Sequence, residues 1–378
     1  MLDLSRVESA IERALSRSDL DETGLLIWLR REFPAEVASQ AVMQIRLRGR
    51  AKRKFSRTEQ MWFTPEGLEQ SSSEMLGMYH ASRYPSGVLV VDAGCGIGGD
   101  LIALARRGTV VGVERDALSV RFAQRNLQVC DVGANAVLVH ADLLRLRMEK
   151  ASFLFLDPSR RTHGRRWLHP EQWMPDWKTC CALASGVRGA LVKSTPALPS
   201  EYLPAQGEYE YLSTEGECRE LLIAFGECRQ GVSRSALILP QRARLTASDA
   251  PMPAVRPLLE WLYDPDPAVV AAHLIPELAE QLGASLVHPQ IAYLTADRFV
   301  PTPSARAYRV IEYFPYSRKT LFSRLRAIGA GVITVKKRGV HQLPEQIVRE
   351  WKPVGHRAVT VLLYRTDSGV MAVLAQEA

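Results

Sequence analysis

The most informative stretch of the chain is glycine-rich: Val91-Asp92-Ala93-Gly94-Cys95-Gly96-Ile97-Gly98-Gly99-Asp100. The apolar residues 88–91 predict a strand before it, and the apolar periodicity of residues 101–106 predicts a helix after it. A strand, a glycine turn and a helix in this order let bare backbone approach a ligand at the carboxyl end of a parallel sheet. The stretch therefore predicts an α/β sheet with a ligand at that edge.

The class of ligand follows from the acid in this stretch. Gly94, Gly96 and Gly99 have the spacing of a dinucleotide fingerprint. However, Asp92 lies two residues before the first glycine, where its carboxylate would repel a pyrophosphate. S-adenosylmethionine has no phosphate and carries an ammonium and a sulfonium group. An acid at this position therefore favours this methyl donor over NAD.

Two further predicted strands also end at acids. Residues 110–113 end at Glu114, at about the offset of twenty residues from the first glycine at which a carboxylate binds ribose hydroxyls. Residues 136–140 are followed by Asp142, which is placed to accept a hydrogen bond from an adenine amino group. The predicted cofactor residues are Asp92, Gly94, Gly96, Gly98, Gly99, Glu114 and Asp142.

A fourth predicted strand, residues 152–156, leads into Asp157-Pro158-Ser159-Arg160. The proline ends the strand sharply, because it disfavours helix at the preceding residue and donates no hydrogen bond. Since this strand end follows three ends of the cofactor type, Asp157 and Pro158 are the predicted catalytic contacts to the substrate. A turn without function is the alternative interpretation.

Together these motifs resemble the class I S-adenosylmethionine-dependent methyltransferases. Residues Met61-Trp62-Phe63-Thr64-Pro65-Glu66 and the glycine stretch are similar to the RNA cap guanine-N2, or trimethylguanosine synthase-like, branch. The carboxyl end, from Ala307-Tyr308-Arg309-Val310 to Val335-Lys336-Lys337-Arg338-Gly339, resembles the THUMP-like domain that follows such enzymes in bacterial proteins. The resemblance covers residues 57–378. It implies a Rossmann-like α/β sheet that is mostly parallel, with its last strand antiparallel.

The acceptor loop departs from the pattern of the amino-directed members of this class. Those members carry an acidic or amide residue, two prolines and an aromatic residue, whereas Asp157 and Pro158 are followed here by Ser159 and Arg160. No aromatic residue stands where a flipped base would stack. The candidates to replace it are Trp62, Phe63, Trp167 and Trp173.

Composition favours a polyanionic partner for the 378-residue chain, whose formal net charge is +7. No acid occurs between Glu36 and Glu59, and this run holds Arg46, Arg48, Arg50, Lys52, Arg53, Lys54 and Arg57. Four arginines and three tryptophans also occur between residues 160 and 177, a mixture that can hold phosphates and stack on unpaired bases. The predicted partner is RNA, and the predicted substrate contacts are Trp62, Phe63, Arg160, Arg161, Trp167, Lys193, Lys336, Lys337 and Arg338.

Other features narrow the class of protein. The six cysteines lack the spacing of a metal site, so reduced thiols and no metal are expected. No signal peptide and no membrane-spanning apolar stretch is recognised, which predicts a cytoplasmic protein without a membrane partner. The oligomeric state is left open.

The chain divides into four predicted segments. These are an N-terminal helical basic arm (1–56), the methyltransferase domain (57–240), a proline-rich connector with a helix at 268–282 (241–300) and the THUMP-like α+β domain (301–378). Within the second segment, residues 221–225 and 235–239 are predicted to pair as a hairpin that supplies the antiparallel strand.

The resulting functional hypothesis is direct methyl transfer to a base in RNA, with a guanine amino group as a candidate acceptor. Asp157 and the carbonyl group of Pro158 would accept hydrogen bonds from the amine, and alignment of the acceptor would be the main catalytic contribution. Two alternatives stay open. One is a non-catalytic RNA-binding protein built on a methyltransferase scaffold, and the other is a methyltransferase acting on protein or on a small molecule.

Overall fold

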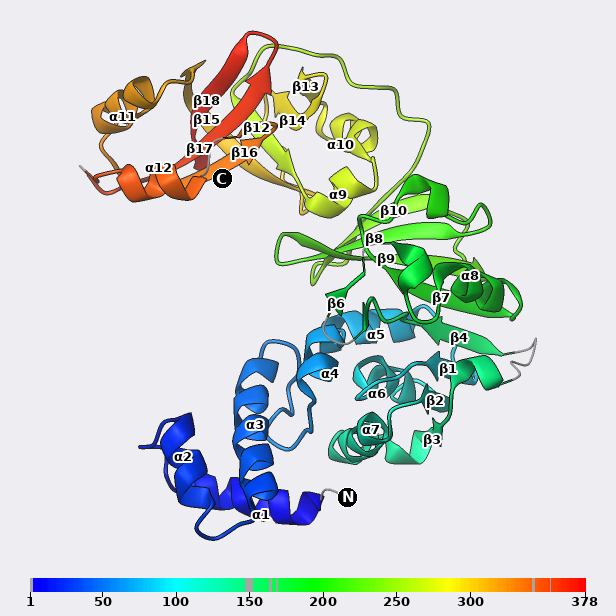
Figure 1. The fold of residues 1–378 in the computed structure, drawn as a ribbon. Coiled ribbons are helices and arrows are strands. Elements are labelled where there is room, and N and C mark those ends of the chain that lie inside the picture. The colour runs from blue at the N-terminus through cyan, green and yellow to red at the C-terminus, as the bar shows by residue number, and fades with distance from the viewer. Residues whose placement is uncertain (1–2, 147–151, 163–164, 168, 342–343, 354) are drawn as a thin grey trace. The chain divides into compact units, whose positions relative to one another are not determined.

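The computed structural model describes residues 3–146, 152–162, 165–167, 169–341, 344–353 and 355–378. The chain forms two compact units (Figure 1). The first contains the residues up to 193 together with 200–206 and 224–230, and the second contains 194–199, 207–223 and the residues from 231 onward. No helix in the described part of the chain is both long enough and apolar enough to cross a membrane.

Three helices open the first unit, as the sequence predicted: α1 (Leu4–Leu15), α2 (Glu22–Leu29) and α3 (Ala35–Ala51). The side chain of Asp3 caps α1 by accepting hydrogen bonds from the backbone amides of residues 5 and 6. Val7, Ile11 and Ala14 are buried on one face of α1, whereas Leu15 at its end is 70% exposed.

A nine-stranded sheet has the order β11-β10-β8-β9-β7-β4-β1-β2-β3. Its strands are β1 (Val90–Ala93), β2 (Val110–Glu114), β3 (Ala136–His140), β4 (Phe153–Leu156), β7 (Gly189–Ser194), β8 (Glu208–Thr214), β9 (Glu217–Gly226), β10 (Arg234–Leu239) and β11 (Ala243–Thr246). Strands β3, β2, β1, β4 and β7 pair in parallel. Their carboxyl ends therefore share one edge, where Ala93 lies opposite Val113 and Leu156.

Helices accompany these strands along the chain. They are α4 (Pro65–Gln70), α5 (Glu74–Ser82), α6 (Gly99–Ala105), α7 (Ala117–Val129) and α8 (Trp177–Ser185), with the two-residue strands β5 (Arg161–Thr162) and β6 (Arg165–Arg166) before α8. Every residue of β1, β4 and β7 is buried. Such apolar runs are expected for parallel strands that are covered on both faces.

The predicted hairpin between residues 221–225 and 235–239 is wrong, because β8 lies between β9 and β10 in the sheet. Only Glu215 and Gly216 connect β8 to β9, and both have positive φ angles, 55° and 75°. A two-residue connection of this kind is the usual turn of a hairpin. Strand β10 then pairs with β8 in parallel, and β11 runs antiparallel to β10.

The second unit contains a seven-stranded sheet in the order β13-β14-β12-β15-β18-β17-β16. The elements are β12 (Trp261–Pro265), α9 (Pro267–Ala271), α10 (Ile275–Leu282), β13 (Ser285–His288), β14 (Ile291–Ala296), β15 (Ala305–Pro315), α11 (Arg318–Ala327), β16 (Ala330–Arg338), α12 (Pro344–Glu350), β17 (Arg357–Thr366) and β18 (Gly369–Glu377). Strand β16 is parallel to β17, and the other neighbouring strands of this sheet pair antiparallel. The α+β architecture predicted for the carboxyl-terminal module is confirmed.

Residues 241–300 hold more regular structure than the sequence predicted. Strands β11 to β14 lie in this range, and the single helix predicted at 268–282 is divided into α9 and α10. The division occurs at His273, which has a φ of 53° and cannot continue a right-handed helix. Periodicity alone does not reveal such a residue, because its neighbours on both sides are apolar.

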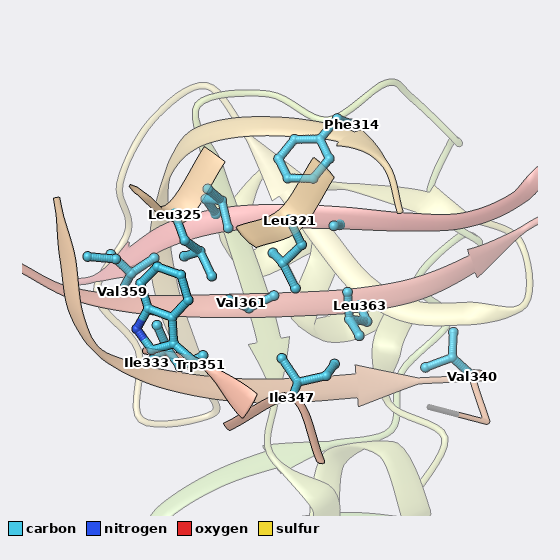
Figure 2. Packing of buried hydrophobic residues seen from close by; sticks show 13 residues of the cluster. Phe314, Leu321, Leu325, Ile333, Val340, Ile347, Trp351, Val359, Val361 and Leu363 are labelled. Carbon is cyan, nitrogen blue, oxygen red and sulfur yellow. The ribbon is translucent and has the colours of Figure 1, made fainter. Parts of the chain in front are cut away.

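Helices α11 and α12 pack on the second sheet through a cluster of buried apolar side chains (Figure 2). Leu321 and Leu325 of α11 have no exposed surface, and Ile347 contributes from α12. Trp351 follows α12, and its indole Nε1 donates a hydrogen bond of 2.9 Å to the carbonyl of Gly331. The buried indole therefore keeps its polar atom satisfied within the core.

We expect Leu321→Ala to lower the free energy of unfolding of the second unit by about 2–5 kcal/mol, because it leaves a cavity in a closed core. Val332→Ala is the matched control, since Val332 is 73% exposed in the same unit, and its effect should stay within about 0.5 kcal/mol. Urea unfolding followed by circular dichroism measures both. Equal stability of the two variants would contradict the described packing.

Candidate functional site

The turn between β1 and α6 exposes bare backbone. Gly94 and Gly96 have φ angles of 92° and 53°, which disfavour other residues. Apart from its own chain neighbours, no atom of the described residues lies within 4 Å of a Cβ atom built on either glycine. These two positions therefore form an open surface of peptide groups at the carboxyl edge of the sheet.

Gly98 and Gly99 serve the packing of the turn instead. A Cβ atom on Gly98 would contact Ala123, and one on Gly99 would lie 3.1 Å from the Cβ atom of Ser71. Gly98 also has a φ of 94°. The predicted glycine set therefore divides into two residues that face open space and two that allow neighbouring segments to approach.

Glu114 lies beside this turn. Its Oε2 atom accepts a hydrogen bond of 3.0 Å from the amide of Gly96, and its Oε1 atom accepts one of 2.8 Å from the amide of Asp116. Asp142 follows β3 and accepts a hydrogen bond of 3.0 Å from the amide of Leu144. The structure thus brings Glu114 to the glycine turn and leaves Asp142 exposed beyond β3.

Asp92 is buried at the end of β1, with 2% of its surface exposed. Its Oδ2 atom has no hydrogen-bond partner among the described residues. Burial raises the pKa of Asp92 well above its usual range, the carboxylates of Asp100, Asp157 and Glu114 raise it further, and Lys193 opposes them. A buried acceptor without a partner costs free energy, which a cationic ligand group would relieve.

Asp100, in the first turn of α6, is fully engaged by neighbouring side chains. Its Oδ1 atom lies 2.7 Å from Nδ1 of His80, and its Oδ2 atom accepts a hydrogen bond of 2.8 Å from the hydroxyl of Ser72. Burial alone raises the pKa of Asp100, but His80, Lys193 and Ser72 together lower it below its ordinary value. The sequence did not single out Ser72 or His80, because neither belongs to a recognisable motif.

Asp157 forms an ion pair with Lys193, with 2.6 Å between its Oδ2 atom and the Nζ atom. About a quarter of the Asp157 side chain (27%) stays exposed, whereas Pro158 is buried. Burial raises the pKa of Asp157, and the charge of Lys193 opposes this effect. Lys193 was predicted as a substrate contact, and the structure instead joins it to the predicted catalytic carboxylate.

Trp62 and Phe63 are buried, with 1% and 0% of their surfaces exposed. The ring of Trp62 lies 5.5 Å from that of Phe122, and the ring of Phe63 lies 5.9 Å from that of Phe55. Neither ring offers an open face on which a base could stack. The structure therefore does not bring these two residues to the substrate side as the sequence predicted, because their apolar rings complete the core beneath the glycine turn.

Two side-chain amides hold the backbone at these rings. Gln44 of α3 donates to the carbonyl of Phe63 (2.7 Å) and accepts from its amide (3.1 Å). Asn126 of α7 accepts from the amide of Trp62 (2.7 Å) and donates to its carbonyl (2.9 Å). Asn126 also donates to the carbonyl of Ile97 in the glycine turn, at 2.9 Å. We call this arrangement of Gln44, Trp62, Phe63, Asn126 and Ile97 the amide clamp.

The loop after β4 brings Arg160 close to Trp167, whose amide donates a hydrogen bond of 2.8 Å to the carbonyl of Arg160. Both residues are half-buried. Trp173 is buried and packs edge-on against Trp177 at 5.7 Å. Trp167 is therefore the predicted ring that retains exposed surface. The side chain of Arg161 lies outside the described residues.

The predicted cations of the second unit meet an acid there. Lys336 and Arg338 bind the two carboxylate oxygens of Asp264 at 2.8 Å and 2.7 Å. They also lie over the rings of Tyr308 and Tyr293, at 5.4 Å and 5.1 Å. Lys337 is exposed.

Several cations of the basic run at residues 46–57 hold neighbouring parts of the chain in place. Nε of Arg48 donates to the carbonyl of Met61 (3.0 Å), and the ammonium of Lys54 donates to three carbonyls between residues 68 and 71. Burial lowers the pKa of Arg48. Arg57 pairs with Asp131. Arg50, Lys52 and Arg53 of this run are exposed and make no hydrogen bond or ion pair with any residue that the structure describes.

The amide clamp leads to a test. Asn126→Ala leaves three buried backbone groups unpaired, each at a cost of about 1–3 kcal/mol, so we expect lower stability and a displaced glycine turn. Affinity for S-adenosylhomocysteine, measured by calorimetry, should fall roughly tenfold or more, which corresponds to 1.4 kcal/mol. Gln124→Ala, an exposed amide on the same helix, is the control. Unchanged affinity and stability in Asn126→Ala would refute the role of the clamp.

Comparisons with known proteins agree with this geometry. Residues 90–156 match the family described as methyltransferase domain, and residues 305–377 match the family described as THUMP domain-like. Two curated relatives, each described as an "uncharacterized S-adenosylmethionine-dependent methyltransferase", come from the CDC 1551 / Oshkosh and H37Rv strains of Mycobacterium tuberculosis. Each is 31% identical over 317 residues, which cover 83% of this chain and 87% of the relative.

A crystal structure described as that of a "putative methyltransferase" from Porphyromonas gingivalis W83 has the same fold. It is 18% identical and covers 100% of both chains with a TM-score of 0.81. The open glycine positions and the unpaired carboxylate oxygen of Asp92 fit a cofactor that carries positive charge and no phosphate. The chain therefore belongs to the S-adenosylmethionine-dependent methyltransferases and carries a THUMP-like domain at its carboxyl end.

Proposed function

We propose that this methyltransferase acts on a base in RNA and that Asp157 with Pro158 holds the acceptor. The observation that carries the proposal is the position of Asp157. It stands at the end of β4, next to β1 and the glycine turn, and its partly exposed carboxylate is fixed by Lys193. An acceptor bound to this carboxylate would face the cofactor directly.

Residues at the neighbouring strand ends would hold the cofactor. The backbone at Gly94 and Gly96 would lie under it, Asp92 would pair with its ammonium group and Glu114 would accept hydrogen bonds from the ribose hydroxyls. The cofactor supplies an activated methyl group on sulfur. Asp142, beyond β3, would bind the adenine amino group in this arrangement.

The chain's own contribution is alignment and a proton acceptor. Asp157 and the Pro158 carbonyl accept hydrogen bonds from an amine and orient its lone pair. When the carbon–nitrogen bond forms and the carbon–sulfur bond breaks, the nitrogen must lose a proton, and Asp157 is placed to take it. An exocyclic amine, such as that of guanine, fits this requirement.

Charge and aromatic surface support RNA as the acceptor. Arg50, Lys52 and Arg53 are exposed in the first unit, and the net charge of the chain is +7. Trp167 retains exposed surface beside Arg160, which suits stacking on an unpaired base. The THUMP-like match adds a second module whose exposed cations include Lys319 and Lys337.

Asp92 makes cofactor binding depend on pH. Since burial raises its pKa, Asp92 holds a proton to higher pH than an ordinary aspartate, and the protonated form cannot pair with an ammonium. Affinity for S-adenosylhomocysteine should therefore fall as the pH falls, and binding should release a proton. Calorimetry in two buffers of different ionisation enthalpy measures that release. Asp92→Asn should abolish it and weaken binding about tenfold, whereas the exposed control Asp116→Asn should retain both.

The acceptor is tested with a tritium-labelled methyl donor and total cellular RNA or protein extract. We expect label in RNase-sensitive material and one methylated nucleoside, found by mass spectrometry, that is missing from cells without this protein. Asp157→Ala should lower transfer about 100-fold or more while the affinity for S-adenosylhomocysteine is kept. Glu59→Gln, an exposed neutralised acid, is the matched control.

Other outcomes would decide between the alternatives. Label confined to RNase-resistant material would favour a protein or small-molecule acceptor. Cofactor binding without transfer to any cellular fraction would favour an RNA-binding protein on a methyltransferase scaffold. Full transfer by Asp157→Ala would remove that residue from the mechanism.

A further inference from the structure

We propose that Lys193, itself anchored by Ser72, is a positioning residue that keeps the carboxylate of Asp157 charged and aimed at the acceptor. This inference rests on the proposed role of Asp157. It replaces the prediction that Lys193 contacts the substrate.

Strand register places the two residues side by side. Leu156 of β4 lies opposite Val192 of β7 in a parallel pair. Asp157 and Lys193 each follow one residue later, at the edge that also holds the glycine turn. The ion pair of 2.6 Å is therefore built into the register of the sheet, and only the end of the lysine side chain needs a further anchor.

Ser72 provides that anchor, and chemistry fixes the direction of its hydrogen bonds. An ammonium only donates, so the hydroxyl of Ser72 accepts from Lys193 over 3.0 Å. Its own proton is then directed to Oδ2 of Asp100, at 2.8 Å. The other oxygen of Asp100 faces Nδ1 of His80 at 2.7 Å. Lys193 is thus tied to a buried chain that ends at α5.

Charge balance explains why a lysine is needed. Burial raises the pKa of Asp157, and the negative charge of Asp100 raises it further. The positive charges of Lys193 and Arg160 lower this pKa. Asp92 adds another buried acid at the end of β1, next to β4. A carboxylate in such surroundings keeps its charge only while a cation stays in contact with it. Without that charge, Asp157 could not accept the proton of an amine.

The same geometry argues against a direct role for Lys193 in binding RNA. Its side chain is 9% exposed, and the two hydrogen bonds described for its ammonium point to Asp157 and Ser72. A phosphate contact requires a cation that reaches solvent. Arg50 and Lys52, which are exposed, meet that requirement.

The test follows the ionisation of Asp157 directly, in the full-length protein without substrate. Aspartate labelled with ¹³C at the carboxyl carbon is titrated by NMR, and the resonance missing from Asp157→Asn identifies Asp157. In Lys193→Met the midpoint should move to higher pH, because the opposing positive charge is gone. In Lys193→Arg it should stay close to that of the native protein, because the charge is retained.

Matched controls separate this effect from general changes of charge. Lys178→Met removes one exposed positive charge from α8 in the same unit and should leave the Asp157 midpoint unchanged. Ser72→Ala should broaden or shift the Asp157 resonance, since Lys193 loses its anchor. An unmoved midpoint in Lys193→Met, or an equal shift in Lys178→Met, would overturn the proposal.

A second readout distinguishes this inference from the proposed function. If RNA is the acceptor, Lys193→Met should lower kcat about 100-fold, with KM for RNA changed by less than about threefold, and Lys193→Arg should recover part of the loss. A substrate-binding lysine would raise KM instead. If the NMR shift is found and Asp157→Ala nevertheless transfers methyl groups normally, the positioning holds and the proposed catalytic role fails.

Discussion

The chemistry of the candidate site depends on several negatively charged side chains that gather at one edge of the sheet in the first unit. Asp92 and Asp100 are buried there and Asp157 is partly buried; parallel register brings Asp92 and Asp157 to neighbouring strand ends, and Asp100 follows in the first turn of α6. Mutual repulsion would make such a cluster unfavourable on its own. Lys193, Ser72 and His80 satisfy two of these acids and leave an oxygen of Asp92 unpaired. This edge of the sheet can therefore accept one more positively charged group. The excess of negative charge there fits a cofactor that carries a sulfonium and an ammonium group.

The parallel part of this sheet could be predicted because its signals are local. A strand, a glycine turn and a helix follow one another within twenty residues, and the acids mark the strand ends at Asp92, Glu114 and Asp157. The elements after residue 305 were predictable for the same reason. The wrong hairpin shows what local sequence patterns could not predict, namely the order of the strands in the sheet. Strand β8 lies between β9 and β10, and nothing in residues 221–239 indicates that an earlier segment of the chain separates them.

Side-chain partners were less predictable than side-chain types. Lys193 was predicted as a substrate contact, but it pairs with an acid 36 residues earlier in the chain. Trp62 and Phe63 looked like stacking surfaces because tryptophan and phenylalanine serve both cores and binding sites. Only packing distinguishes the two uses, and here both rings are enclosed. Ser72 and His80 gain their importance solely from the neighbours that the fold gives them.

The amide clamp has a consequence for the N-terminal helices. Gln44 satisfies both backbone groups of Phe63, as an adjacent strand would, although no strand is present at that place. Gln44 and Arg48 of the preceding helix α3 thus pair the backbone groups of Phe63 and the carbonyl of Met61, whereas Asn126 of α7 pairs those of Trp62. A protein shortened to begin at residue 57 would expose an apolar segment with unpaired peptide groups directly beneath the glycine turn. Helix α3 therefore supplies hydrogen bonds that a neighbouring strand would supply in a sheet, and a methyltransferase domain without the N-terminal helices would lack them.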